Sequence, residues 1–299
     1  MLRGLRRTLQ RLAPPEDVTA GGPPIFVHGM SRSGGTLAAT ILDAHPEVAM
    51  SYELYPWMLE DAPAGLAQAF DDAPTVRKGA TKLPPNLKTF FLRGERSGLG
   101  TAEIAEALHA RDDLSTEAGR ITLVARLARA KMRMTGKSRW GVKCGIDFAG
   151  YTAMWPGARF VGIVRDGRDV LASQQTTGSF DRDAAHIARA WVRDFAAFQA
   201  LIDDQDVQAL RVRYESLVAG PEPEIRRIAE FAGVEFDERM LHHSEQELTV
   251  FDAHHLSMDR ITVPIDATQV GRWRRDVSPE DIEAFWTVAG DTMAAAGYA

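Results

Sequence analysis

The chain has very little cysteine. Cys144 is the single one among 299 residues, which excludes an internal disulfide bond and a cysteine-based metal cluster. No hydrophobic run is long enough to span a bilayer. The N-terminus lacks the apolar core and the small-residue cleavage site of a secretory signal. The formal net charge of −6 argues against general nucleic-acid binding. We therefore expect a cytoplasmic chain with no membrane span and no nucleic-acid partner.

Apolar residues make up 45% of the chain, enough for a large core. We expect residues 1–22 to form a basic arm and linker, and residues 23–299 to form a single domain. The arm combines arginines with leucines at helical spacing, and proline and glycine then dominate residues 14–24. The pattern predicts a solvated arm or a helix packed on the body; contact with an acidic lipid surface or a partner is the alternative.

Short apolar segments alternate with helical patterns along the chain. The segments that fit buried strands are residues 25–27, 48–50, 140–142, 159–164 and 210–214. Helical spacing occurs at residues 37–44, 101–111, 121–134, 184–202 and 222–232. Strands that alternate with helices predict an α/β fold with a parallel sheet covered on both faces. Residues 56–138 contain no clear strand and are expected to form a helical insertion after the second strand, a common place for a lid or an acceptor pocket.

Residues 25–36 read I-F-V-H-G-M-S-R-S-G-G-T, an apolar run, a glycine loop and the start of a helical pattern. Loop N–H groups and the helix dipole would together form an anion site there. The spacing from Gly29 to Gly34 matches the first half of a nucleotide P-loop. Gly35 stands where a triphosphatase needs lysine, and the cation is instead Arg32. The loop therefore predicts binding of a phosphate-like group without the usual triphosphate chemistry, with a plain tight turn as the alternative.

A second candidate anion site lies in residues 159–173, R-F-V-G-I-V-R-D-G-R-D-V-L-A-S. Arg165 ends an apolar strand, and Ser173 lies two turns into the helix that follows. The planar fork of the arginine and the serine hydroxyl can converge on one anion. The alternative is that Arg165 pairs with Asp166 or Asp169 and that Ser173 is an ordinary helix residue.

Together these motifs resemble sulfotransferases. Residues 31–37, S-R-S-G-G-T-L, resemble their 5′-phosphosulfate loop, and residues 164–168 with Ser173 resemble their 3′-phosphate motif. Residues 212–217, V-R-Y-E-S-L, and residues 271–275, G-R-W-R-R, are similar to later segments of the superfamily. The nearest likeness is to protein-tyrosine sulfotransferases and their bacterial relatives. It runs from about residue 25 to the C-terminus and is thin across residues 56–138.

The resemblance implies a P-loop NTPase-like fold and an enzyme that uses 3′-phosphoadenosine 5′-phosphosulfate (PAPS) as co-substrate, without a metal. It implies a hydroxyl acceptor on a small molecule or a peptide, and a homodimer is left open. The residues it implies for PAPS binding are Arg32, Ser33, Gly34, Gly35, Thr36, Leu37, Arg165, Ser173, Tyr214 and Arg272.

The resemblance also implies three catalytic residues. Glu53, just past the second strand, matches the general base of the tyrosine enzymes. Lys143 would face the sulfate at the end of the third strand, and Arg32 would neutralise charge on the leaving phosphate. Two alternatives stay open: Glu53 pairs with an arginine of the insertion, and Lys143 is a solvated strand-end lysine.

Some positions depart from the family pattern. Gly35 replaces the first threonine of the usual pair, so one hydroxyl contact to phosphate is missing. Thr177 and Val263 fall near positions where the tyrosine enzymes carry basic cofactor contacts. Arg272 and Arg274 are candidates to compensate for them.

The sequence leaves two other functions open. One is a P-loop kinase for a small molecule, which Gly35 and the lack of a clear magnesium aspartate argue against. The other is an inactive nucleotide-binding module. His28 is expected to be a packed strand residue. The histidines at 242–243 and 254–255 lack i,i+4 ligand spacing, so we expect no metal site.

Overall fold

The computed structural model describes residues 21–63, 65–108, 113–146, 148–177, 183–247, 249–250 and 257–298. The expected N-terminal arm, up to residue 20, lies outside the described residues. The order of the elements follows the predicted alternation of strands and helices, and the predicted α/β class is confirmed.

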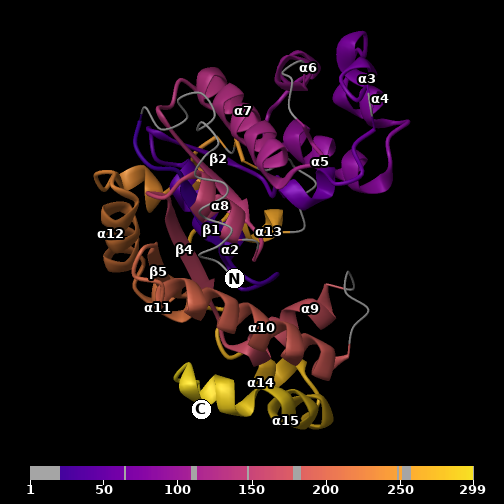
Figure 1. Ribbon diagram of the computed structural model, residues 1–299. Helices are drawn as coiled ribbons and strands as arrows, with labels where there is room; N and C mark the ends of the chain where they lie inside the picture. Colours follow the sequence, from indigo (N-terminus) through magenta and orange to yellow (C-terminus); the bar gives the residue numbers. More distant parts are fainter. Residues whose placement is uncertain are drawn as a thin grey trace.

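Five strands form one parallel sheet in the order β2-β3-β1-β4-β5 (Figure 1). The strands are β1 Ile25–His28, β2 Val48–Ser51, β3 Arg139–Cys144, β4 Arg159–Val164 and β5 Gln208–Arg213. Because all neighbours are parallel, their carboxyl ends share one edge, and the glycine loop, Glu53 and Arg165 all follow strands there.

Helices cover both faces of the sheet, because alternate residues of each strand point to opposite sides. Phe26 packs in a core with α7 (Glu117–Thr135), α8 (Phe148–Met154) and α10 (Ala184–Ile202). Ile25 and Val27 pack in a second core with α2 (Gly35–Asp43), α11 (Tyr214–Ala219) and α12 (Pro221–Ala232). The strands lie between these two layers (Figure 1).

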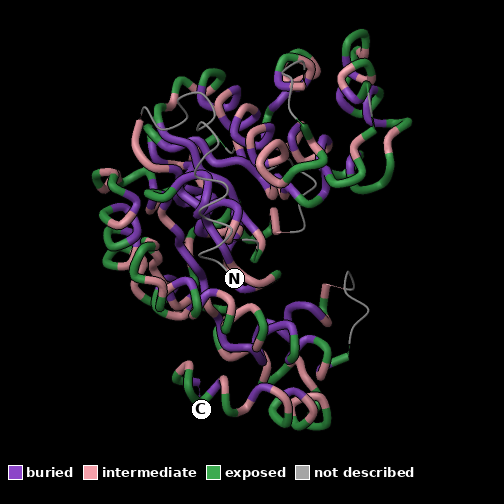
Figure 2. Tube along the Cα trace, viewed as in Figure 1, coloured by how far each residue is buried: buried purple, intermediate pink, exposed green. Residues whose placement is uncertain are grey.

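The described residues between β2 and β3 fold as helices, as expected. They form η1 (Pro56–Leu59), α3 (Gln68–Asp71), α4 (Val76–Ala80), α5 (Pro85–Arg96), α6 (Thr101–Leu108) and α7. Figure 2 shows buried sheet strands and more exposure on the outlying α3 and α4. Helix α5 packs against η1, which brings the insertion close to the carboxyl end of β2.

A third group of helices forms the opposite end of the molecule. Helix α9 (Gly167–Thr176) follows β4 and packs with α10, α14 (Trp273–Asp276) and α15 (Pro279–Ala295) around a separate small core (Figure 1). Because α9 starts at the sheet edge, this group holds one side of the candidate site. No helix in the described residues is long and apolar enough to cross a membrane.

Candidate functional site

The glycine loop lies between β1 and the nine-residue helix α2. Gly34 adopts a left-handed φ of 101° at the helix N-cap, and a Cβ there would lie 2.5 Å from the Tyr214 ring. The Ser33 hydroxyl is buried over Gly29 and has no hydrogen-bond partner. Thr36 and Leu37 follow in the first helical turn. An unpartnered buried donor at a helix N-terminus is suited to an anion.

Lys143 of β3 places a cation beside Gly35, a loop position that has no charged side chain of its own. A Cβ on Gly35, the position of the lysine in a triphosphatase loop, would lie 3.4 Å from Lys143 Cε. Lys143 is 7% exposed, so the alternative of a solvated strand-end lysine is wrong. Because Gly35 has no side chain, it leaves room for the side chain of Lys143, which carries its charge to the loop from β3.

The structure brings the two sequence motifs together. Arg32 Nε donates to Ser173 Oγ over 3.0 Å, which joins the loop to α9. Arg165 Nη1 donates to the Arg32 carbonyl over 3.2 Å, and its guanidinium lies 4.5 Å from the centre of the Tyr214 ring. Arg165 also approaches Asp169 at 3.8 Å, so the alternative ion pair is present as well. Arg165 Nε is buried without a partner and stays available to an anion.

Positive charge is concentrated around Arg32. Burial lowers the pKa of its guanidinium; Asp259 raises it, and nearby Arg165, Arg272 and Arg260 lower it further. Arginine keeps its charge despite such shifts. A cluster of cations around a partly buried loop is stabilised by an anion.

Arg272 lies at the far side of this cluster. Its guanidinium binds Asp276 at 2.7 Å, the Gln269 side chain at 2.9 Å and Thr176 Oγ1 at 3.0 Å. It therefore reaches the end of α9 beside Thr177, where the family pattern has a basic residue. Buried Asp169 accepts from the N–H groups that flank Arg272, at Gly271 (2.8 Å) and Trp273 (3.0 Å). Burial raises the pKa of the Asp169 carboxyl.

Glu53 lies two residues beyond β2, beside the carboxyl end of β3. Lys143 Nζ donates to Glu53 Oε1, and Arg93 Nη2 lies 3.3 Å from Glu53 Oε2. Arg93 belongs to α5, so the alternative of a pair with an insertion arginine is also realised. Burial and the nearby Glu53 charge raise the pKa of Tyr52 and of Tyr55. The two tyrosines therefore stay protonated around the carboxylate.

Arg32 and Glu53 share an unusual backbone conformation. Among the described residues they are the non-glycine residues with positive φ, at 75° and 40°. Such a conformation costs about 1–3 kcal/mol and persists only where the surroundings hold it. The sequence predicts a catalytic role for both residues, and strain of this kind concentrates at functional sites.

Comparison with known proteins decides the family. The model of the sulfotransferase family matches residues 23–238. The chain belongs to the sulfotransferase family. Protein-tyrosine sulfotransferase A of Caenorhabditis elegans is 24% identical, over 92% of this chain and 67% of the relative. Protein-tyrosine sulfotransferase 1 of Danio rerio is 23% identical, over 99% of this chain and 78% of the relative.

Solved structures agree on the fold of this sulfotransferase. The sulfotransferase domain of the Synechococcus PCC 7002 olefin synthase aligns with a TM-score of 0.58 and 20% identity, covering 92% of this chain and 97% of that one. The domain from the curacin biosynthetic pathway aligns at 0.56 and 15% identity, covering 93% and 98%. The predicted family, fold class and enzyme class are confirmed.

Three residues that contact the site are not predicted from the sequence of this sulfotransferase. Ser257 Oγ accepts from Arg32 Nη1 over 3.0 Å. Gln269 accepts from Arg165 Nη2 through its backbone carbonyl, so its side chain gives no signal. Arg93 lies in the insertion, where the likeness to the family is thin. A serine before a short helix, α13 (Met258–Ile261), is equally unremarkable in sequence.

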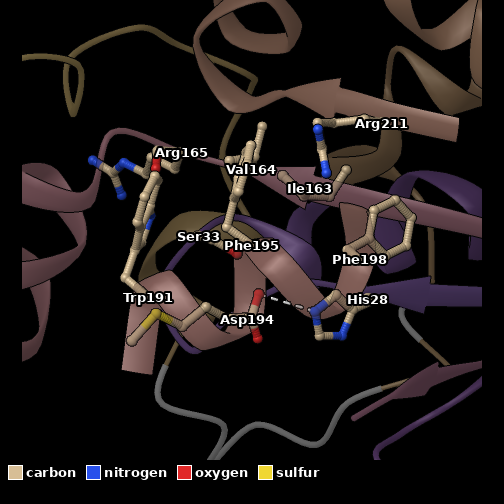
Figure 3. A pocket seen from close by; sticks show the side chains of 12 residues that line it. His28, Ser33, Ile163, Val164, Arg165, Trp191, Asp194, Phe195, Phe198 and Arg211 are labelled. Atoms are coloured by element: carbon tan, nitrogen blue, oxygen red, sulfur yellow. Dashed lines mark hydrogen bonds and ion pairs between the residues drawn. The ribbon is translucent and has the colours of Figure 1, made fainter. Parts of the chain in front are cut away.

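His28 lies on the other face of the sheet, as a packed strand residue. Its Nε2 is 3.0 Å from Asp194 Oδ2, its Nδ1 is 3.4 Å from the Cys144 carbonyl, and its side chain is 4% exposed. Figure 3 shows the pair in a pocket whose walls include Phe195 and Phe198 of α10. Both ring nitrogens of His28 have partners, so this sulfotransferase does not present it to an acceptor as a base.

Among the described residues, the other histidines form no metal site. His243 is fully buried, and burial lowers its pKa to about 4, so the ring is neutral at pH 7. The histidines at 254–255 lie outside the described residues. Within the part of the chain that the structure describes, no group of three or more His, Cys, Asp and Glu side chains is placed to hold a metal ion.

Proposed function

We propose that this sulfotransferase transfers a sulfuryl group from PAPS to a hydroxyl acceptor, with Glu53 as general base. The observation that carries the proposal is the pair of buried, unpartnered donors. Ser33 Oγ lies in the loop assigned to the 5′-phosphosulfate, and Arg165 Nε lies in the motif assigned to the 3′-phosphate. A buried donor without a partner is costly, and a phosphate oxygen at each position would relieve that cost. The two positions therefore fit a nucleotide with a phosphate at both ends.

The proposed reaction is an in-line displacement at sulfur. The acceptor oxygen forms a bond to sulfur while the bond from sulfur to the bridging phosphate oxygen breaks. The acceptor proton passes to the Glu53 carboxylate, and the electron pair of the broken bond stays on adenosine 3′,5′-bisphosphate (PAP). Positioning and electrostatics dominate such transfers. Arg32 would stabilise negative charge on the leaving phosphate, and Lys143 would do so on the bridging or sulfuryl oxygens.

The contact between Lys143 and Glu53 gives the lysine a second part in this scheme. The ammonium contacts the carboxylate before the acceptor binds, and an opposite charge nearby favours the charged form of a carboxyl group. Lys143 also lies beside Gly35 at the loop, within reach of a sulfuryl group bound there. When Lys143 turns to that group, Glu53 keeps its contact with Arg93 and accepts the acceptor proton.

The acceptor and the cellular location are further parts of the proposal. Relatives named protein-tyrosine sulfotransferases favour a peptide or phenolic hydroxyl, and the open alternative is another small-molecule hydroxyl. Labelled PAPS offered with tyrosine peptides, phenols, sugars and alkyl alcohols separates these classes. We also propose that the protein is located in the cytoplasm and forms a homodimer.

Ligand choice tests the donor directly. We expect PAP to raise the melting temperature without added metal, since a ligand at 100 times its Kd stabilises by about 2.7 kcal/mol. ATP with magnesium should give a smaller shift, because Gly35 removes the loop lysine. Differential scanning fluorimetry with both ligands and with EDTA measures this. A larger shift with ATP and magnesium, and none with PAP, would contradict the proposal and favour a kinase.

Arg165→Ala tests the 3′-phosphate position. We expect the affinity for PAP to fall by about 2–3 kcal/mol, the range for a hydrogen bond to a charged group. Arg165 is 4% exposed, so we also expect some loss of stability. Arg165→Lys keeps the charge and serves as the second variant. Isothermal calorimetry makes the measurement, with exposed Arg226→Ala as control; unchanged affinity in folded Arg165→Ala would remove the residue from the site.

A further inference from the structure

We propose that Arg93 is a positioning residue for Glu53, through which the helical insertion controls the general base. This inference rests on the proposed function, because it takes Glu53 to be the base. Arg93 comes from α5, a helix of the insertion, and reaches across to the segment that follows β2. Among the described residues, the Arg93 guanidinium contacts Glu53 and its neighbours and not the glycine loop or the Arg165 motif. Its effect should therefore fall on proton transfer and not on binding of PAPS.

The contacts of Arg93 fix both the backbone and the side chain of Glu53. Nη1 donates to the Glu53 carbonyl over 3.2 Å, and Nη2 lies 3.3 Å from Glu53 Oε2. The guanidinium also packs over the rings of Tyr52 (5.7 Å) and Tyr55 (5.1 Å). A planar fork with two donor directions can hold a carbonyl and a carboxylate together, which a lysine ammonium cannot do as well.

The left-handed backbone of Glu53 needs such support. Its φ of 40° is unfavourable for a residue with a Cβ, so neighbouring contacts have to maintain it. The Glu53 carbonyl accepts from Arg93 and from the Tyr55 N–H at 3.0 Å. One turn further on, at the C-cap of α5, Ser97 Oγ accepts from the Tyr52 N–H over 2.8 Å. Arg93 and Ser97 are four residues apart, so one face of α5 holds the segment on both sides of Glu53.

The two carboxylate oxygens of Glu53 have separate cations. Lys143 on β3 binds Oε1, and Arg93 on α5 binds Oε2. Tyr52 and Tyr55 lie beside the carboxylate as neutral groups. The charge of Arg96, which like Arg93 belongs to α5, lowers the pKa of Tyr52 in opposition to burial. If Lys143 turns to the sulfuryl group during transfer, Arg93 stays in contact with Glu53 Oε2. Arg93 would then favour the ionised form of Glu53 and hold its carboxylate toward the acceptor hydroxyl while the acceptor loses its proton.

The pH dependence of turnover tests this role. With saturating PAPS, the rate should rise with pH as the base becomes ionised. A neighbouring cation favours the ionised carboxylate, so Arg93→Gln should move the midpoint of this acidic limb upward by about one pH unit. The plateau rate should also fall by about tenfold, because the base is less well oriented. Arg93→Lys should keep the midpoint near its wild-type value and still lower the plateau.

Two comparisons separate positioning from a general loss of stability. Arg133→Gln removes another insertion arginine, whose ion pair with Glu106 has the same 3.3 Å separation but is exposed, and it should leave the profile unchanged. In a Glu53→Gln background, Arg93→Gln should slow turnover no further, because its effect passes through Glu53. The thermal shift with PAP should be the same in every variant, which reports an intact donor site.

The possible results discriminate between this inference and the proposed function. A slow Glu53→Gln together with a wild-type profile for Arg93→Gln would overturn the role of Arg93 alone. Additive losses in the double variant would also overturn it, because Arg93 would then act independently of Glu53. Wild-type turnover in Glu53→Gln would overturn the base assignment and this inference with it. A midpoint that moves upward in Arg93→Gln but stays near the wild-type value in Arg93→Lys and in Arg133→Gln would support it.

Discussion

Glu53→Gln should lower single-turnover sulfuryl transfer by about 10²- to 10⁴-fold while leaving the affinity for PAPS nearly unchanged, the range for loss of a general base. Glutamine keeps the size of the side chain and can still accept from Lys143 and Arg93, which both contact Glu53. It cannot take the acceptor proton. The variant therefore removes the proposed chemistry with little change in packing.

The acceptor should modulate the size of this loss. A phenol of low pKa needs less help in losing its proton than an alkyl alcohol, so it should suffer less in Glu53→Gln. Rapid-quench measurements with saturating PAPS and both acceptor types test this, and Glu106→Gln, an exposed carboxylate of α6, is the control. Wild-type rates in Glu53→Gln would remove it from the mechanism. Attention would then turn to the histidines at 242–243 and 254–255 as candidate bases, since both ring nitrogens of His28 have partners.

Much of the scaffold could be predicted because it depends on local pattern. Apolar runs bounded by glycine or charge located all five strands to within two residues at each end. Helix α10 was predicted over the residues that it occupies, because its apolar spacing persists for five turns and Asp183 caps its start. The anion loop could be predicted for the same reason, because it is one continuous segment with glycines at fixed spacing.

The rest of the site depends on contacts between distant segments. Ser257 reaches Arg32 across 225 residues, and Arg93 reaches Glu53 across 40, in a segment with little likeness to the family. The left-handed backbone at Arg32 and Glu53 has no sequence signature, because neither is a glycine or an asparagine. From the sequence alone, an ion pair of Glu53 with an insertion arginine is an alternative to a catalytic role. The structure shows that the contact exists and is compatible with both interpretations.

Lys143→Met should lower turnover by about 10²- to 10³-fold, the usual cost of removing one preorganised donor from a site of developing charge. Methionine matches the apolar stem of the lysine, so the fold should change little at this buried position. Glu53 keeps Arg93 as a partner and is not left as an uncompensated buried charge. Exposed Lys88→Met on α5 is the matched control and should keep wild-type turnover.

The pH profile of Lys143→Met distinguishes two parts that Lys143 can play. If the ammonium only keeps Glu53 ionised, the acidic limb moves to higher pH and turnover returns to the wild-type plateau once the carboxylate has lost its proton. If it also stabilises negative charge on the sulfuryl or bridging oxygens, the deficit persists at every pH. We expect the persistent deficit, because Lys143 lies beside Gly35, where the loop has no cation of its own. Full recovery at high pH would restrict Lys143 to its contact with Glu53 and leave Arg32 as the cation for the leaving group.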